Sequence, residues 1–215
     1  MSTKRLKGLA LRGGTLLGSL VIVVFVSLAW SGSTRQQQKT LQNLQTAYDD
    51  KANAHARYLA FADRAQHEEH YEVASLFRAA AYSQHIQFER FADLMRKMGA
   101  EHAPRIKSPE VKTTTENLKA AMEEWQVAER DTLYTGFIRD AEGEGVAEAA
   151  RAFRYARISE AQLSKLFKVS LEELQTTGVE SHPYYVCKMC GYTSEHSVTP
   201  CPGCSDPHAT YVRVD

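Results

Sequence analysis

The sequence predicts a mainly helical protein: a four-helix bundle with one long crossover, followed by a small C-terminal domain that binds a metal through four cysteines. Three observations support this fold class. Apolar residues recur every three or four positions over most of the chain, two stretches of the chain repeat each other, and all the cysteines lie near the C-terminus. An apolar run near the N-terminus adds a predicted transmembrane helix.

The predicted transmembrane helix is the run from residue 13 to residue 30. The flank before it, residues 1–12, is basic and contains no acidic residue. As a helix the run would span about 27 Å, close to the thickness of a bilayer core. A cleaved signal peptide is the alternative, because Ser27 and Ala29 would suit a cleavage site. The basic flank predicts a single-pass membrane protein with its N-terminus in the cytoplasm and its soluble domains on the periplasmic side.

A polar tether at residues 31–39 leads into the predicted bundle, residues 40–178. Glycine, proline and polar residues divide the helical pattern into four helices. Their approximate ranges are 40–67, 71–98, 114–142 and 146–175. Only the link between the second and third helices is long, so two helix hairpins joined by a crossover are expected.

An internal repeat relates the two hairpins at an offset of 76 residues. Tyr58 matches Tyr134, and Phe77 matches Phe153. The other matched pairs are Phe61 with Phe137, Ala65 with Ala141, Ala74 with Ala150, and Ala80 with Ala156. We expect these aromatic and alanine residues to pack in the core of the bundle.

The C-terminal region, residues 179–215, contains two Cys-x2-Cys pairs. The four cysteines are Cys187, Cys190, Cys201 and Cys204. Glycine or proline accompanies each pair and indicates a tight turn. Four thiolates at this spacing suit one tetrahedral ion, iron or zinc, and the spacing does not distinguish the two. Two disulfides are the alternative.

These features together resemble the rubrerythrin family over residues 40–215. The similar phrases are "NAHARYLAFADRA", "ASLFRAAA", "TTTENLKAAM" and "AARAFRYA", with the tail Tyr-Tyr-x-Cys-x2-Cys-Gly-Tyr and Cys-Pro-x-Cys. The resemblance implies a ferritin-like bundle in which two irons reduce hydrogen peroxide. It also implies a rubredoxin-like domain, in which one iron with four cysteine ligands supplies electrons, and a homodimer.

Most positions of the family's di-iron ligand pattern carry other residues in this chain. One expected Glu falls on Lys51, and the expected Glu-x-x-His pairs fall on Gln84 with Gln87 and on Glu160 with Leu163. The seven positions are Lys51, Gln84, Gln87, Gln126, Glu129, Glu160 and Leu163. Only Glu129 and Glu160 keep a ligand type, so we expect no di-iron centre.

A polar network is the predicted replacement for the di-iron centre. A buried Lys51 would need an anionic partner, which Glu129 or Glu160 could supply. The alternative is that Lys51 points to solvent.

Three functions fit these features. The favoured one is a membrane-anchored, rubrerythrin-like redox protein that passes one electron through the four-cysteine iron to an unknown partner protein. The others are a peroxidase with an unusual metal site at Glu129 and Glu160, and a zinc-stabilised structural subunit of a membrane complex. The 26 basic and 26 acidic residues give no net charge, which argues against a nucleic-acid partner.

Overall fold

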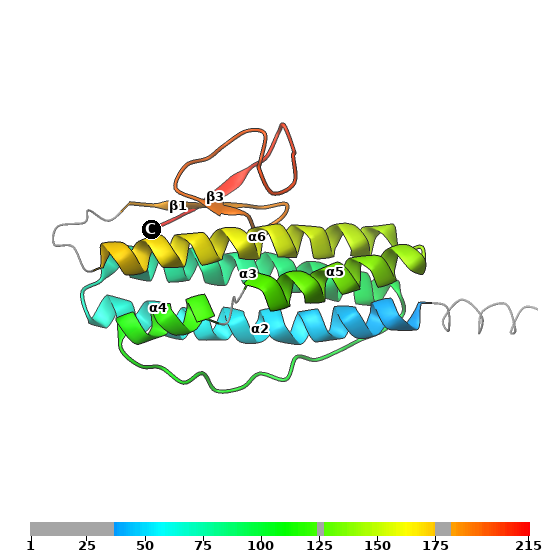
Figure 1. The fold of residues 1–215 in the computed structure, drawn as a ribbon, viewed down its shortest axis with the longest axis horizontal. Helices are drawn as coiled ribbons and strands as arrows, with labels where there is room; N and C mark the ends of the chain where they lie inside the picture. The colour runs from blue at the N-terminus through cyan, green and yellow to red at the C-terminus, as the bar shows by residue number, and fades with distance from the viewer. Residues whose placement is uncertain (1–36, 124–126, 175–181) are drawn as a thin grey trace, which may run out of the picture. The chain divides into compact units, whose positions relative to one another are not determined.

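The computed structural model describes residues 37–123, 127–174 and 182–215. These residues form a helical bundle and a small sheet (Figure 1). The helices are α2 (Gln38–His67), α3 (Tyr71–Lys97), α4 (Thr114–Glu123), α5 (Val127–Gly143) and α6 (Ala147–Glu173). The strands are β1 (Tyr184–Cys187), β2 (Thr193–Ser194) and β3 (Tyr211–Val214), which pair antiparallel in the order β2-β1-β3.

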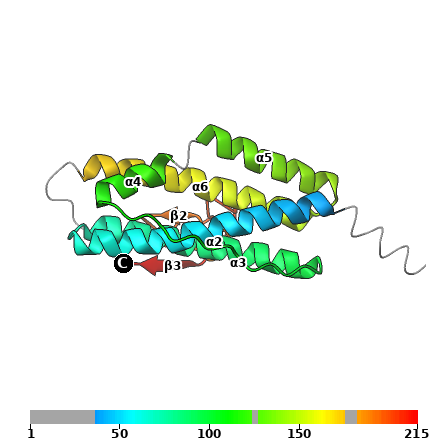
Figure 2. The same ribbon diagram turned by 90° about the horizontal axis from the view of Figure 1, so that it is seen from below.

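The predicted helix boundaries are close to the observed ones. Tight turns separate α2 from α3 and α5 from α6, with left-handed backbone at Glu69 and Gly145. The third predicted helix is described as two helices, α4 and α5, and residues 124–126 between them lie outside the described part. Figure 2 shows α4 and α5 following one another along α6.

The long crossover joins the end of α3 to the start of α4 and runs back along α2 (Figures 1 and 2). The Asn53 side chain fixes it, because its Nδ2 donates to the Arg105 carbonyl at 2.9 Å and its Oδ1 accepts from the Lys107 N–H at 2.8 Å. A capping box then starts α4. The Glu116 N–H donates to Thr113 Oγ1 and the Thr113 N–H donates to Glu116 Oε2, at 3.3 and 3.2 Å.

All twelve residues of the matched repeat pairs are buried, which confirms their predicted packing role. They divide between two apolar clusters. Tyr58, Phe61 and Phe77 pack in the first cluster, which Phe167 joins. The repeat partners of these three aromatic residues pack in the second cluster, which Phe91 joins.

A polar layer lies between the two apolar clusters. Lys51 of α2 stands between Tyr48 of the second cluster and Ala54 of the first, and α3 and α6 each carry buried polar residues in the corresponding stretch. Those residues are Ser83, Gln84, Gln87, Ser159 and Glu160. The interior is therefore polar where the family pattern would place a di-iron centre.

The membrane topology predicted from the sequence is corrected by the structure. Among the described residues, no helix is both long and apolar enough to cross a bilayer. The helices α2, α3 and α6 have 27 to 30 residues, but each carries charged residues along one face. This overturns the single-pass membrane protein with periplasmic domains. The run 13–30, on which that prediction rested, lies outside the described residues, as does the flank 1–12.

Candidate metal centre

The four cysteines converge on one point at the end of the small sheet. Their sulfur atoms all lie within 4.8 Å of one another. Cys187 Sγ is 3.9 Å from Cys204 Sγ, and Cys190 Sγ is 3.7 Å from Cys201 Sγ. A tetrahedral ion with metal–sulfur bonds of about 2.3 Å requires sulfur atoms roughly 3.8 Å apart. The four side chains are free thiols, and their sulfur spacing fits one such ion better than two disulfides, whose sulfur atoms would lie about 2.05 Å apart.

Two short turns aim the thiols and several backbone N–H groups at this point. In the first turn the N–H groups of Met189 and Cys190 donate to Cys187 Sγ, and that of Tyr192 donates to Cys190 Sγ. The second turn repeats the design, with the Asp206 N–H donating to the sulfur of Cys204. Such donors stabilise thiolates, which are the form that binds a metal.

Hydrogen bonding between thiols and burial shift the pKa values of the thiols in opposite directions. The hydrogen bond from Cys190 lowers the pKa of Cys187 to about 5, and the same bond raises the pKa of Cys190. Burial raises the pKa of Cys204 to about 11. One thiol therefore ionises readily near neutral pH, whereas Cys190 and Cys204 would need a nearby cation to do so.

The first turn rests directly on the bundle. Ser83 Oγ of α3 donates to the Gly191 carbonyl at 2.6 Å, and Ser159 Oγ of α6 donates to the Cys190 carbonyl at 2.9 Å. Gly191 has a φ of +78°, and a Cβ there would lie 2.9 Å from Ser83 Oγ and 3.1 Å from Gln87 Nε2. Only glycine allows this close approach of the turn to α3.

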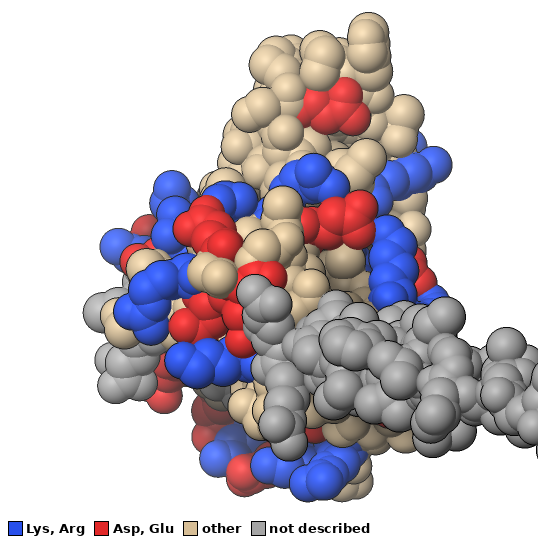
Figure 3. Space-filling view, turned by 90° about the vertical axis from the view of Figure 1, so that its right-hand side faces the viewer, with Lys and Arg blue, Asp and Glu red and all other residues tan. Residues whose placement is uncertain are grey.

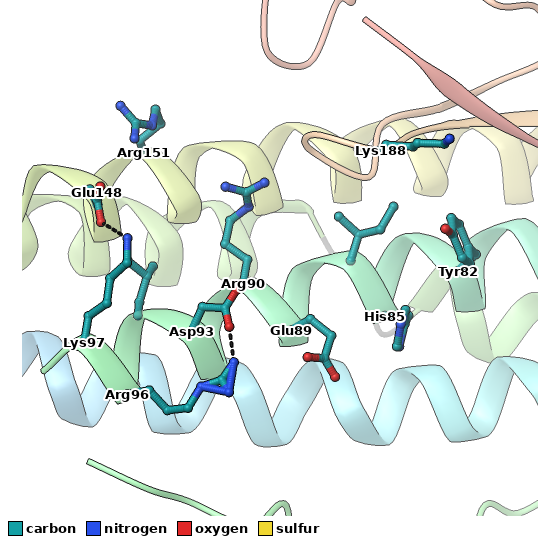
Figure 4. A pocket seen from close by; sticks show the side chains of 12 residues that line it. Tyr82, His85, Glu89, Arg90, Asp93, Arg96, Lys97, Glu148, Arg151 and Lys188 are labelled. Atoms are coloured by element: carbon teal, nitrogen blue, oxygen red, sulfur yellow. Dashed lines mark hydrogen bonds and ion pairs between the residues drawn. The ribbon is translucent and has the colours of Figure 1, made fainter. Parts of the chain in front are cut away.

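The outer edge of the first turn borders a surface groove on α3 and α6 (Figure 4). Arg90 donates to the Met189 carbonyl and places its guanidinium 5.7 Å from the centre of the Tyr155 ring. The groove has both signs of charge, because Lys97 of α3 pairs with Glu148 of α6 at 2.8 Å. On the face drawn in Figure 3, charged side chains gather mainly over the bundle, and the lobe above it is largely uncharged.

Within the bundle, the polar layer is built around Lys51. Its side chain has no exposed surface, which contradicts the alternative that it points to solvent. The Lys51 ammonium forms an ion pair with Glu160 Oε1, which also accepts a hydrogen bond from the Tyr134 hydroxyl at 3.3 Å. Asp50, which is partly exposed, lies 3.3 Å from the same ammonium. The predicted pairing of Lys51 with Glu160 is thus present.

The other described positions of the predicted di-iron site carry no carboxylate. Gln84 is fully buried, and neither end of its amide has a hydrogen-bond partner among the described residues. Gln87 Nε2 donates to Ser83 Oγ at 3.3 Å. Leu163 belongs to the first apolar cluster.

The placed residues do not fit a pair of iron ions. Glu160 is the only carboxylate among the five described ligand positions, and a buried ammonium occupies the space beside it. Gln126 and the side chain of Glu129 lie outside the described part of the chain. The sequence therefore located this cluster, but the structure places only part of it.

Two serines that hold the first turn were not among the predicted site residues. Ser83 and Ser159 are themselves 76 residues apart, the offset of the internal repeat, and each directly precedes a predicted ligand position. The repeat therefore contained the signal. A matched pair of serines is a weaker signal than a matched aromatic pair, because serine neither fills a core nor is a usual metal ligand.

Comparison with known proteins identifies the family. A family model described as rubrerythrin matches residues 42–169, which is more than half of the chain. The chain belongs to the rubrerythrin family. This confirms the resemblance read from the sequence, and the match spans the bundle from α2 into α6.

The curated relatives include other members of the rubrerythrin family. Nigerythrin from Nitratidesulfovibrio vulgaris is 27% identical over 175 residues, which covers 80% of this chain and 85% of nigerythrin. Rubrerythrin from Porphyromonas gingivalis is 29% identical over 182 residues, covering 80% of this chain and 88% of that protein. Solved structures of nigerythrin in its fully reduced, all-ferrous state and in a mixed-valence state each align with a TM-score of 0.72 at 26% identity. Both cover 80% of this chain and 86% of nigerythrin. The chain is a rubrerythrin-like redox protein with a ferritin-like bundle and a C-terminal four-cysteine site.

Proposed function

We propose that this protein transfers single electrons through one iron held by Cys187, Cys190, Cys201 and Cys204. The convergence of the four sulfur atoms within 4.8 Å is the observation that supports this proposal most directly. Iron is favoured over zinc because the nigerythrin structures are of ferrous and mixed-valence states. When bound by four thiolates, iron accepts and releases one electron without a change in its ligands.

The residues around the thiols suit this role. Cys187, Cys190 and Cys201 are buried, which excludes water from most of the site. Cys204 is partly exposed, so an electron donor or acceptor would approach closest at this sulfur. The N–H groups of the two turns would stabilise the extra negative charge of the reduced site. The donor and acceptor would be other redox proteins or small carriers that reach this edge.

We further propose that the bundle holds no di-iron centre. The ion pair of Lys51 with Glu160 supports this, because a buried ammonium repels dications and occupies a carboxylate that they would need. On this proposal the bundle is a scaffold for the four-cysteine site and its docking surface. Peroxide reduction by a di-iron mechanism is then not expected. The homodimer implied by the family resemblance stays a prediction.

An anaerobic redox titration of the full chain, reconstituted with iron, tests the one-electron function. We expect a red protein with one tightly bound ferric ion that is bleached by one electron per chain and recovers its colour on reoxidation. A matched sample loaded with zinc is expected to be colourless and redox-inactive. A chain that selects zinc from an equimolar mixture with ferrous iron, and stays colourless in air, would instead support a structural role.

A further inference from the structure

The first turn, which carries Cys187 and Cys190, is held by two serines related by the internal repeat. Ser83 and Ser159 are both fully buried, and they donate to consecutive carbonyls of the turn, those of Gly191 and Cys190. The two hairpins thus present equivalent hydroxyl groups to one stretch of backbone. The two hydrogen bonds look alike, but they act on different peptide groups.

The peptide group that accepts the Ser83 hydrogen bond also donates a hydrogen bond to a sulfur atom. The Gly191 carbonyl belongs to the same peptide group as the Tyr192 N–H, and that N–H donates to Cys190 Sγ. A hydrogen bond accepted by a carbonyl polarises its peptide group and makes the N–H a stronger donor. The Ser83 hydroxyl therefore strengthens a hydrogen bond to a metal-binding sulfur.

The peptide group that accepts the Ser159 hydrogen bond donates to a carbonyl oxygen instead of a sulfur atom. The Cys190 carbonyl shares its peptide group with the Gly191 N–H, which donates to the Cys187 carbonyl at 2.8 Å and not to a sulfur atom. Ser159 attaches the turn to α6 as Ser83 attaches it to α3. It lacks the direct connection to a thiolate.

The chain of hydrogen bonds begins at Gln87, where the family resemblance implies a histidine ligand. Gln87 Nε2 donates to Ser83 Oγ at 3.3 Å, which leaves the serine hydrogen free to point at the Gly191 carbonyl at 2.6 Å. Gln87 is 3% exposed, so water does not compete strongly for these bonds. A histidine ligand at this position would direct its nitrogen to a metal, whereas the amide directs its hydrogen toward the four-cysteine site.

We propose that Gln87 and Ser83 are positioning residues that raise the reduction potential of the four-cysteine iron. They act through the sequence Gln87 Nε2–H to Ser83 Oγ–H, to the Gly191–Tyr192 peptide, to Cys190 Sγ. Reduction by a one-electron donor adds one electron and no proton, so the charge of a ferric ion with four thiolates changes from −1 to −2. The strengthened N–H donor stabilises the more negative state more strongly. This inference rests on the proposed one-electron function.

The test compares Ser83→Ala, Gln87→Leu and the matched control Ser159→Ala in the full chain loaded with iron. We expect Ser83→Ala to lower the equilibrium constant for reduction by dithionite about threefold, or about 30 mV at 59 mV per tenfold. Gln87→Leu should lower it by less, in the same direction. Ser159→Ala should leave the potential unchanged, although it removes a comparable contact between the turn and the bundle. Equal shifts for Ser83→Ala and Ser159→Ala, or no shift for Ser83→Ala, would overturn the proposal.

A second measurement does not depend on iron. In the cadmium-loaded chain, the NMR signal of the Tyr192 amide proton should move upfield in Ser83→Ala and Gln87→Leu, and stay in place in Ser159→Ala. An unchanged Tyr192 signal in Gln87→Leu and Ser83→Ala contradicts the hydrogen-bond chain itself. If the protein binds no redox-active iron, the proposed function fails while this measurement still decides the role of Ser83. If Ser83→Ala does not fold, Gln87→Leu carries the same comparison.

Discussion

Replacing Lys51 by methionine is expected to destabilise the folded chain by about 3–5 kcal/mol. The substitution keeps the length and burial of the side chain but removes the ammonium that pairs with Glu160. Glu160 is 2% exposed, so its carboxylate would then be buried without a counter-charge. Chemical denaturation followed by far-UV circular dichroism measures the loss.

Two controls separate the ion pair from general packing damage. The double variant Lys51→Met/Glu160→Gln removes both charges and keeps an acceptor for the Tyr134 hydroxyl, so it should recover most of the lost stability. Lys97→Met breaks an exposed ion pair with Glu148 and should have little effect. A double variant no more stable than Lys51→Met alone would contradict a compensating charge pair in the bundle.

Replacing Cys201 by serine is expected to abolish tight metal binding. The sulfur of Cys201 lies 3.7 Å from that of Cys190, and a tetrahedral ion would lose one of its four thiolates. In small zinc-binding peptides a structural metal contributes about 10–16 kcal/mol to the free energy of folding. The small sheet should therefore become less stable as well. Metal retention after dialysis against a chelator, read with the visible spectrum, measures the effect.

The bundle should survive the loss of the metal. Its two apolar clusters are formed largely by helix residues, so the far-UV circular dichroism of Cys201→Ser should stay mainly helical. Ser197→Ala, an exposed substitution in the same region, is the matched control and should keep the metal. A Cys201→Ser protein that retains one ion as tightly as the wild type would show that the metal is bound elsewhere.

Much of the fold could be predicted because the internal repeat gives the pattern of one helix hairpin twice. The pairs Tyr58 with Tyr134 and Phe77 with Phe153 established two similar hairpins, and all four residues are buried in the structure. The spacing of the cysteines likewise predicted a convergent site, because glycine or proline at each Cys-x2-Cys pair indicated a tight turn, and the four sulfur atoms do converge.

Other features depend on contacts between residues far apart in the sequence. Whether Lys51 points inward depends on how α2 sits in the bundle, where the Lys51 ammonium reaches Glu160 of α6, and periodicity alone left both orientations open. The serine contacts with the turn appear only when the C-terminal region is placed on α3 and α6. The apolar run 13–30 predicted a membrane topology from its length and hydropathy, whereas no helix among the described residues is both long and apolar enough to cross a bilayer.

Counting the metals of the full chain shows whether the four-cysteine site is the iron site and whether the bundle holds iron as well. Protein loaded anaerobically with excess ferrous iron and then desalted should contain one iron per chain, and the Cys201→Ser variant should contain none. This result is expected if the four-cysteine site is the sole iron site and the Lys51–Glu160 pair excludes iron from the bundle. About three irons per wild-type chain, with about two retained in Cys201→Ser, would contradict the account by placing a di-iron centre in the bundle.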